Sequence, residues 1–242
     1  MGIEEYPRNL EMLARSYITD YLAEGSKEML IQRARQLAFF IRNKRKKTPA
    51  RWMFSIPFEH PLVFKISDVD GLKLQVDIVC EIEGCGNDIN KYNIVLRVWS
   101  LDERISYREM LDAIELKDVL ASCGWKRVML RFHLDLRDPK VRKPEPLYHL
   151  QVGGNPRGDE NCWLHKSIDV PRFHHPPMDV VLLCEFILVN FFHEKSEGLR
   201  QKPEWRSLVR KSQDIFQKDY FTNCVNHLKD DAGTLLENWI KN

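Results

Sequence analysis

The sequence lacks the cysteine spacing that marks a metal-binding or disulfide-rich fold. Its six cysteines include no C-x-x-C pair and follow no regular interval. The chain therefore signals neither a zinc ribbon nor a disulfide framework. We interpret the cysteines as buried, reduced thiols, and no cofactor is predicted.

The chain also lacks a strong net charge and a long apolar run. Its formal net charge is +2, so no field of the whole molecule attracts nucleic acid or a membrane. The most apolar stretch, 178–192, contains Asp179, Glu185 and Asn190 and is shorter than the ~20 residues of a bilayer-spanning helix. The first ten residues have no secretory pattern. We predict a cytoplasmic protein with no membrane partner.

What the sequence does contain is enough apolar material for a substantial core. Hydrophobic residues make up 43% and charged residues 30% of 242 residues, the balance of an ordinary globular protein. No internal repeat or low-complexity segment is visible. Residues 7–47 have a helical pattern that breaks at Gly25, with Ser26 suited to cap the second helix. Residues 1–50 are therefore expected to form a two-helix annex.

The second helix of this annex ends in a basic block. Between Ser26 and Arg51 the chain has nine Lys or Arg residues and one acid, Glu28. Such a block can bind phosphates by displacing counterions, although basic residues also suit a helix C-terminus for electrostatic reasons. The predicted nucleic-acid-binding residues are Arg42, Lys44, Arg45, Lys46 and Lys47.

After residue 50 the apolar period changes from 3.6 to 2, which predicts strands. Apolar residues alternate with polar ones in 62–66, 72–82, 92–98, 126–137 and 147–153. Asp70-Gly71 predicts a tight turn, and residues 84–88 a longer loop. A capping box at Ser106 predicts a helix to about residue 122. The polar side of the strands includes Asp77, Glu81, Asn93 and Arg97.

The fold predicted from these patterns is α+β. It consists of an antiparallel meander of about five strands, with helices covering one face, plus the N-terminal helical annex. Within the domain 51–242, the strands occupy 51–153, a loop occupies 154–177 and helices occupy 178–242. Pro203 is expected to open one of these helices.

The strands 126–137 and 147–153 are predicted to form a hairpin that carries a histidine on each strand. A turn centred near residue 141 would place His133 opposite His149 and Arg131 opposite Gln151. A slip by two residues stays open, because it keeps the apolar residues on one face. Directly opposed side chains lie ~4.5–5.5 Å apart at Cβ, so both rings could contact one bound group.

This hairpin could support metal-free phosphodiester chemistry. Two histidines can serve as general acid and general base, while an arginine neutralises charge on a phosphoryl group. Arg172 and the pair His174-His175 follow in a loop that could close over the same face. The predicted catalytic residues are His133, His149, Arg131, Asp135, Gln151 and Arg172. The alternative is that these are ordinary solvent-facing polar residues of a strand.

Two metal-dependent interpretations are also open. His133, Asp135 and His149 could form a set of two histidines and one carboxylate. Asp77, Glu81 and Glu83 could hold magnesium on a central strand, although the stretch contains no E-x-K pattern. Glu185, inside the apolar helix, must either reach the helix surface or meet a basic partner such as Arg131.

The part of the chain from Phe132 to Phe192 resembles an uncharacterised bacterial family of unknown function. The similar elements are H-L-D at 133–135, H-L-Q-V-G-G at 149–154, P-R-F-H at 171–174 and F-I-L-V-N-F-F at 186–192. The resemblance implies a bacterial cytoplasmic protein from a mobile or antiviral gene neighbourhood. It brings no established activity.

The order of elements also resembles the ubiquitin-conjugating fold: a helix, a meander, a histidine-containing flap, a cysteine and further helices. This likeness implies that 148–151 is the flap and that Cys162 is the acceptor thiol. The family's H-P-N motif reads H-L-Q here, and a predicted helix splits the meander.

Three functions follow from these patterns. The first is an enzyme that processes an RNA or nucleotide phosphodiester through the histidine pair. The second is a non-catalytic module that binds nucleic acid or a protein partner, in a bacterial defence system. The third is a conjugation-type scaffold centred on Cys162. The sequence does not indicate an oligomeric state.

Overall fold

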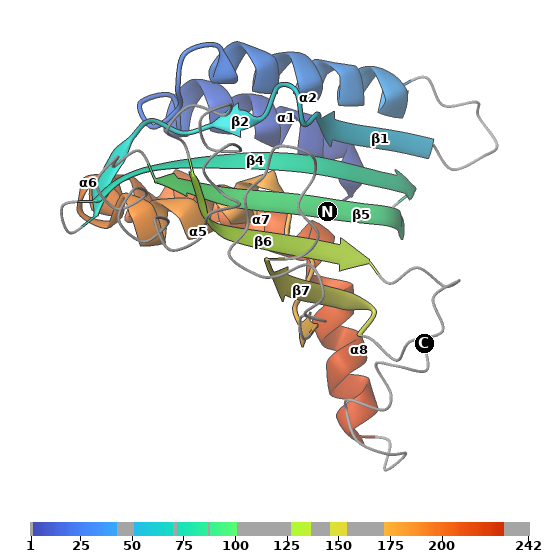
Figure 1. Cartoon of the computed structure of the whole chain (residues 1–242). Helices are drawn as coiled ribbons and strands as arrows, with labels where there is room; N and C mark the ends of the chain where they lie inside the picture. The colour runs from blue at the N-terminus through green and yellow to red at the C-terminus, as the bar shows by residue number, and fades with distance from the viewer. Residues whose placement is uncertain are drawn as a thin grey trace.

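The chain forms one antiparallel sheet with helices, as the alternating pattern predicted (Figure 1). The computed structural model describes residues 2–42, 51–69, 72–86, 88–100, 127–136, 146–153 and 172–229. The predicted helix at 106–122 and the predicted turn at 70–71 lie outside these residues. The fold class α+β is confirmed.

The N-terminal region is helical up to residue 42. A 3-10 turn (Ile3–Glu5) leads into α1 (Tyr6–Met12), a π-helical turn (Leu13–Tyr17) and then α2 (Ser26–Arg42). Gly25, just before α2, has a φ of +78°, which is why glycine suits this helix junction. The Ser26 hydroxyl accepts the backbone N–H of Val63 at 3.1 Å, so it ties α2 to the sheet.

The sheet has the order β1-β4-β5-β6-β7-β8, and β2 and β3 also pair with β4. The strand bounds are Arg51–Ile56 (β1), Leu62–Val63 (β2), Ser67–Val69 (β3), Leu72–Cys85 (β4), Asp88–Ser100 (β5), Arg127–Leu136 (β6), Tyr148–Val152 (β7) and Phe173–His174 (β8). All pairs are antiparallel.

Three details of the strand predictions were wrong. The strand β1 falls within the predicted strand region 51–153 but was not identified as a strand of its own, although Trp52, Phe54 and Ile56 alternate in it and are buried. The expected loop at 84–88 is shorter, because β4 and β5 pair up to Cys85 and Asp88 with a register shift at Glu83/Gly84. Ile66 and Leu130 were assigned to the apolar face but are 52% and 45% exposed.

One hydrophobic core joins both groups of helices to one face of the sheet. It contains Leu30, Ala34, Leu37 and Ile41, which recur at i, i+4, i+7 and i+11 and form one apolar stripe along α2, together with inward residues of β1, β4, β5 and β6. In Figure 1 the C-terminal helices α5 and α7 pass behind the strands, and α8 projects past β7. The opposite face of the sheet carries the polar side chains, and the candidate site lies there.

The C-terminal helices are α5 (Val180–Phe191), α6 (His193–Arg200), α7 (Pro203–Phe216) and α8 (Lys218–Lys229). Pro203 is the first residue of α7, as predicted. Five of the first eight residues of α5 are 0–2% exposed, so this apolar helix is buried in protein. Among the described residues, no helix combines the length and hydropathy that a membrane crossing requires.

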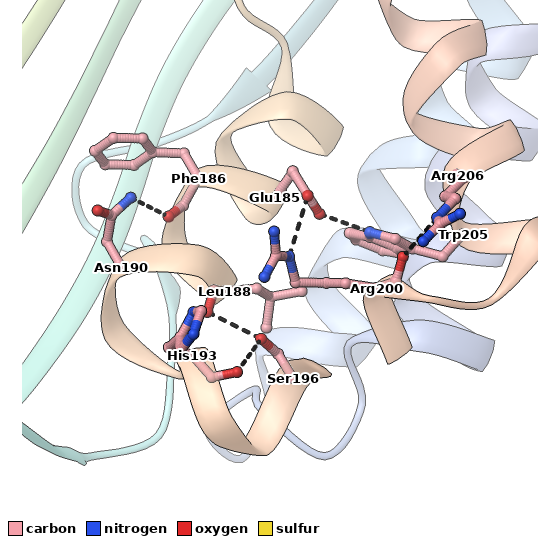
Figure 2. Close-up of polar contacts among 9 residues, drawn as sticks. All are labelled: Glu185, Phe186, Leu188, Asn190, His193, Ser196, Arg200, Trp205 and Arg206. Carbon is pink, nitrogen blue, oxygen red and sulfur yellow. Dashed lines mark hydrogen bonds and ion pairs between the residues drawn. The ribbon is translucent and has the colours of Figure 1, made fainter. Parts of the chain in front are cut away.

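Glu185 reaches the edge of α5 and is paired there (Figure 2). Its carboxylate accepts the Trp205 indole N–H at 2.6 Å and the Arg200 Nε–H at 3.2 Å. Its side chain is 28% exposed. Glu185 therefore reaches the edge of the helix and also meets a basic partner, which is Arg200 and not Arg131. These contacts join α5 to α6 and α7.

Candidate functional site

The polar face of the sheet is a grid of side chains from four neighbouring strands. Cross-strand partners in a pleated sheet project to the same side, so the observed registers define rows across β4, β5, β6 and β7. The rows are Asp77–Arg97–Arg131, then Val79–Val95–His133–Gln151, then Glu81–Asn93–Asp135–His149.

The hairpin of β6 and β7 has a register two residues away from the preferred prediction. His133 pairs with Gln151, and His149 pairs with Asp135. The ladder continues at Gly153, whose N–H donates to the Arg131 carbonyl at 2.7 Å. The two histidines are therefore diagonal neighbours, a relation that separates residues by roughly 7–8 Å. The apolar pattern could not distinguish the two registers because both keep the same residues on each face.

His133 lies half-buried between an amide and a carboxylate. Its Nε2 is 3.0 Å from Asn93 Nδ2 and 3.8 Å from Asp135 Oδ2. The neutral ring can accept the Asn93 N–H, and the protonated ring can interact with the Asp135 carboxylate. Both protonation states thus have a suitable neighbour, as a proton-exchanging group requires.

His149 is more deeply placed, with 4% of its surface exposed. Its Nδ1 lies 3.2 Å from the carbonyl oxygen of Pro146. A carbonyl oxygen only accepts, so this contact puts the proton on Nδ1 and makes Nε2 the accepting nitrogen. Asp135 lies directly opposite His149 in the ladder, so the two side chains project to the same face of the sheet.

The first row contains a buried ion pair that the sequence did not identify. Arg97 donates from Nε to Asp77 Oδ1 at 2.7 Å and from Nη2 to Oδ2 at 2.9 Å. Trp99 Nε1 donates to the same Oδ2 at 2.9 Å. The Phe58 ring covers the guanidinium, with its centroid 4.5 Å from Arg97 Cζ. These contacts fix the orientation of Arg97.

Arg131 lies directly opposite Arg97 in the ladder and is also buried, at 4% exposure. Its Nη1 donates to the Gly153 carbonyl oxygen at 2.7 Å. This row therefore places two guanidinium groups side by side on the polar face, and guanidinium groups are well suited to contact a phosphate.

Arg172 reaches the same face through Gln151. In the amide orientation that satisfies both groups, the Gln151 oxygen accepts from Arg172 Nε at 2.8 Å and from Nη2 at 3.2 Å. This contact brings Arg172 to the row of His133. The loop before β8 therefore adds a third arginine to the site, as the sequence predicted.

The pair His174-His175 contributes less to this site. His174 is in register with His149 and contacts the Tyr220 hydroxyl of α8 at 2.6 Å. The His175 Nδ1 lies 2.6 Å from the Pro176 carbonyl oxygen. Burial is the main cause that lowers the pKa of both histidines. Both rings are therefore neutral at pH 7 and add no charge for an anion.

The acidic residues proposed for magnesium are paired with cations. Asp77 is held by Arg97, and Lys91 lies 2.8 Å from Glu81 and 3.4 Å from Glu83. Within the described ranges, no three His, Cys, Asp or Glu side chains are grouped closely enough to hold a metal ion. The set of His133, Asp135 and His149 is thus not assembled as a metal site.

The basic block is described only at its first residue. Arg42 is exposed in the last turn of α2, whereas Lys44, Arg45, Lys46 and Lys47 lie outside the described residues. Cys162, the acceptor thiol implied by the ubiquitin-conjugating likeness, also lies outside them. The roles of these residues stay predictions.

Comparisons with protein-family models, curated proteins and solved structures found no match to this chain. The resemblance to the bacterial family therefore rests on its short sequence motifs alone, and the likeness to the ubiquitin-conjugating fold rests on the order of elements. The candidate site is defined by its own geometry.

The site includes residues that the sequence did not nominate, chiefly Asn93, Arg97 and Trp99, and it includes Asp77, which the sequence nominated only as a magnesium ligand. The signal available in the sequence was the alternation of polar and apolar residues, which had already placed Asp77, Asn93 and Arg97 on the polar face. Their proximity to His133 or Arg131 depends on the long-range pairing of β4, β5 and β6.

Proposed function

We propose that the polar face binds the phosphate of an RNA or nucleotide and that the protein cleaves or transfers the phosphodiester bond. The observation that carries this proposal is the placement of Arg131, His133 and His149 on one face, each about 7 Å from the next by strand geometry. A phosphate that accepts hydrogen bonds of about 2.8 Å on two sides spans a similar distance.

The contacts of the two rings support a division of labour. His149, with its Nδ1 proton held by Pro146, takes a proton at Nε2 from the attacking hydroxyl, whose oxygen then bonds to phosphorus. His133, whose imidazolium the Asp135 carboxylate stabilises, gives a proton to the leaving oxygen as the P–O bond breaks. Arg131 stabilises the charge that develops on the phosphoryl oxygens.

The test is turnover of a fluorogenic RNA oligonucleotide by the wild type and by single-histidine variants. We expect His133→Ala and His149→Asn each to lower kcat by about 10²–10⁴-fold, the usual contribution of a general acid or base. Asparagine at 149 keeps an N–H that can donate to Pro146. His60→Ala is the matched control, because His60 is exposed in the loop after β1, and we expect it to retain full activity.

The pH profile adds a second criterion. An acid and a base that act together give a bell-shaped kcat/KM profile, and each single variant should lose one limb. Full turnover by the double variant His133→Ala/His149→Asn, with an unchanged melting temperature, would refute the catalytic assignment.

A second candidate function, binding without turnover, is favoured by the deep burial of His149. In that case the wild type binds the RNA oligonucleotide but does not cleave it. The Arg131→Gln variant should weaken binding and lower its salt dependence. The two histidine variants should leave binding unchanged.

A further inference from the structure

A groove between α2 and β1 lies apart from the polar site. It measures about 520 Å³, and its lining includes Arg33, Phe39 and Phe40 from α2 and Met53, Phe54 and Ser55 from β1. Successive residues of a strand point to opposite faces of the sheet. Because three successive residues line one groove, the groove follows the backbone edge of β1.

The β1 strand is the terminal strand of the sheet in the described part of the chain. It pairs with β4 along one edge, and the strand order places no described strand on its other edge. The outward N–H and C=O groups of such an edge can pair with another strand. Figure 1 shows α2 running alongside β1, where the helix provides the second wall of the groove.

The rim of this groove is unusually apolar for a surface. Phe39 is 65%, Phe40 43% and Met53 42% exposed, and the two phenylalanine rings meet at a centroid distance of 6.3 Å. A cluster of exposed large apolar side chains marks an interaction site more often than a single one does. Their position beside an open strand edge suits side chains that alternate along an added strand.

The charge around the groove has one dominant sign. Arg33 and Arg35 line it, and Arg42 and Arg51 lie exposed at the end of α2 and the start of β1. The nearby acid Glu11 is paired with Arg35 at 3.1 Å. A second copy of the chain would bring the same arginines together and would be repelled. An acidic segment would be attracted.

We propose that the groove binds a protein partner through an extended segment that alternates acidic and apolar residues and adds as a strand to β1. The backbone of the segment pairs with the outer edge of β1. Its apolar side chains contact Phe39 and Phe40 on the side of α2, and its carboxylates project to the opposite face of the strand, where Arg51 and Met53 lie. Main-chain pairing gives affinity in this binding mode, and the side chains give specificity.

The test uses fluorescence anisotropy with a labelled peptide of about eight residues, within the usual length of a strand, in which Glu and Val alternate. We expect it to bind the full chain with a Kd of roughly 10–100 μM. The same peptide with Lys in place of Glu should bind at least about tenfold more weakly. A version N-methylated at alternate amides should lose a similar factor, because it cannot form the ladder.

Variants of exposed residues locate the peptide on the protein. Phe39→Ser/Phe40→Ser should weaken binding by about tenfold or more, whereas Phe221→Ser on α8, which changes an aromatic that is 51% exposed, should have no effect. Arg42→Glu/Arg51→Glu should transfer the preference to the Lys peptide. Arg210→Glu on α7, also at an exposed position, is the charge control.

Three results would overturn the proposal. One is no binding of the Glu peptide at about 1 mM. Another is equal binding of the N-methylated peptide, which would exclude strand addition. The third is a concentration-dependent dimer in sedimentation that Phe39→Ser/Phe40→Ser abolishes, since a second copy would then occupy the groove.

Discussion

Asp179 is fully buried, and its replacement tests how the C-terminal helices are held on the sheet. Its carboxylate caps α5 by accepting the Leu182 N–H at 2.9 Å, and it accepts the Ser212 hydroxyl of α7 at 2.5 Å. Burial is the largest cause that raises the pKa of Tyr6, Cys80, Tyr92 and Cys184, and the charge of Asp179 raises each of these pKa values further. One side chain thus affects α1, α5, α7, β4 and β5.

Burial is the largest cause that raises the pKa of Asp179 above its ordinary value of 3.8. Burial therefore makes the folded state prefer the protonated form. The contribution of Asp179 to the free energy of unfolding is most favourable below pH about 4. It falls as the pH rises through the folded-state pKa and is constant at higher pH.

Two substitutions at this position should destabilise the fold to different extents. Asp179→Ala removes the helix cap, worth about 0.5–2 kcal/mol, and leaves the buried Ser212 hydroxyl without this acceptor, which costs about 1–3 kcal/mol. We expect a total loss of about 2–4 kcal/mol. Asp179→Asn keeps an acceptor for the Leu182 N–H and a group that can bond to Ser212, so near pH 4 its cost should be below about 1 kcal/mol.

The assay is urea unfolding from pH 4 to pH 8, with Ser212→Ala and the double variant to complete a mutant cycle. Relative to the wild type, Asp179→Asn should become more stable as the pH rises, because it has no carboxylate to ionise. If its stability followed the wild-type pH dependence in parallel, the buried carboxylate would not be the cause. A coupling energy near zero between Asp179 and Ser212 would refute the proposed link between α5 and α7.

Two further predictions concern the sheet. Arg97→Met removes the bidentate partner of the buried Asp77 carboxylate and should lower the free energy of unfolding by about 3–5 kcal/mol, whereas Asp77→Leu/Arg97→Met should recover most of that loss in the same urea assay. Gly84→Ala would make the added Cβ clash with the Trp52 ring and the Asp88 carbonyl oxygen. It should lower the free energy of unfolding by about 1–3 kcal/mol. A thermal melt compares it with Gly25→Ala, where nothing lies within 4 Å of the added Cβ and only the φ of +78° opposes the substitution. Equal losses at the two sites would contradict the steric explanation for Gly84.

The parts of the fold that depend on local periodicity could be predicted from the sequence. The stripe of α2, the buried helix α5 and the start of α7 at Pro203 all follow from patterns within one helix. The strands β4 to β7 follow from alternation, since one face must be apolar to cover a core. These features need no knowledge of the partner element.

The parts that depend on distant pairing could not be predicted in the same way. The strand β1 pairs with β4 and not with β2, so the paired residues are about thirty positions apart in the sequence. No local pattern in Arg51–Ile56 specifies that partner. The register of β6 and β7 is set partly by the contact of Gly153 with Arg131. The ion pair of Asp77 and Arg97 likewise requires the observed pairing of β4 with β5.

The buried charges on the polar face argue for a ligand more strongly than for stability. Arg97, Arg131 and His149 are each 4% exposed on the face away from the hydrophobic core. Burying an ion pair is costly, and apolar residues of similar volume are often as stable or more stable. A fold that needed only a second covered face would be served by valine and leucine at these positions. The arginines and the histidine that are kept there are groups that contact a phosphate well, which is the ligand proposed above.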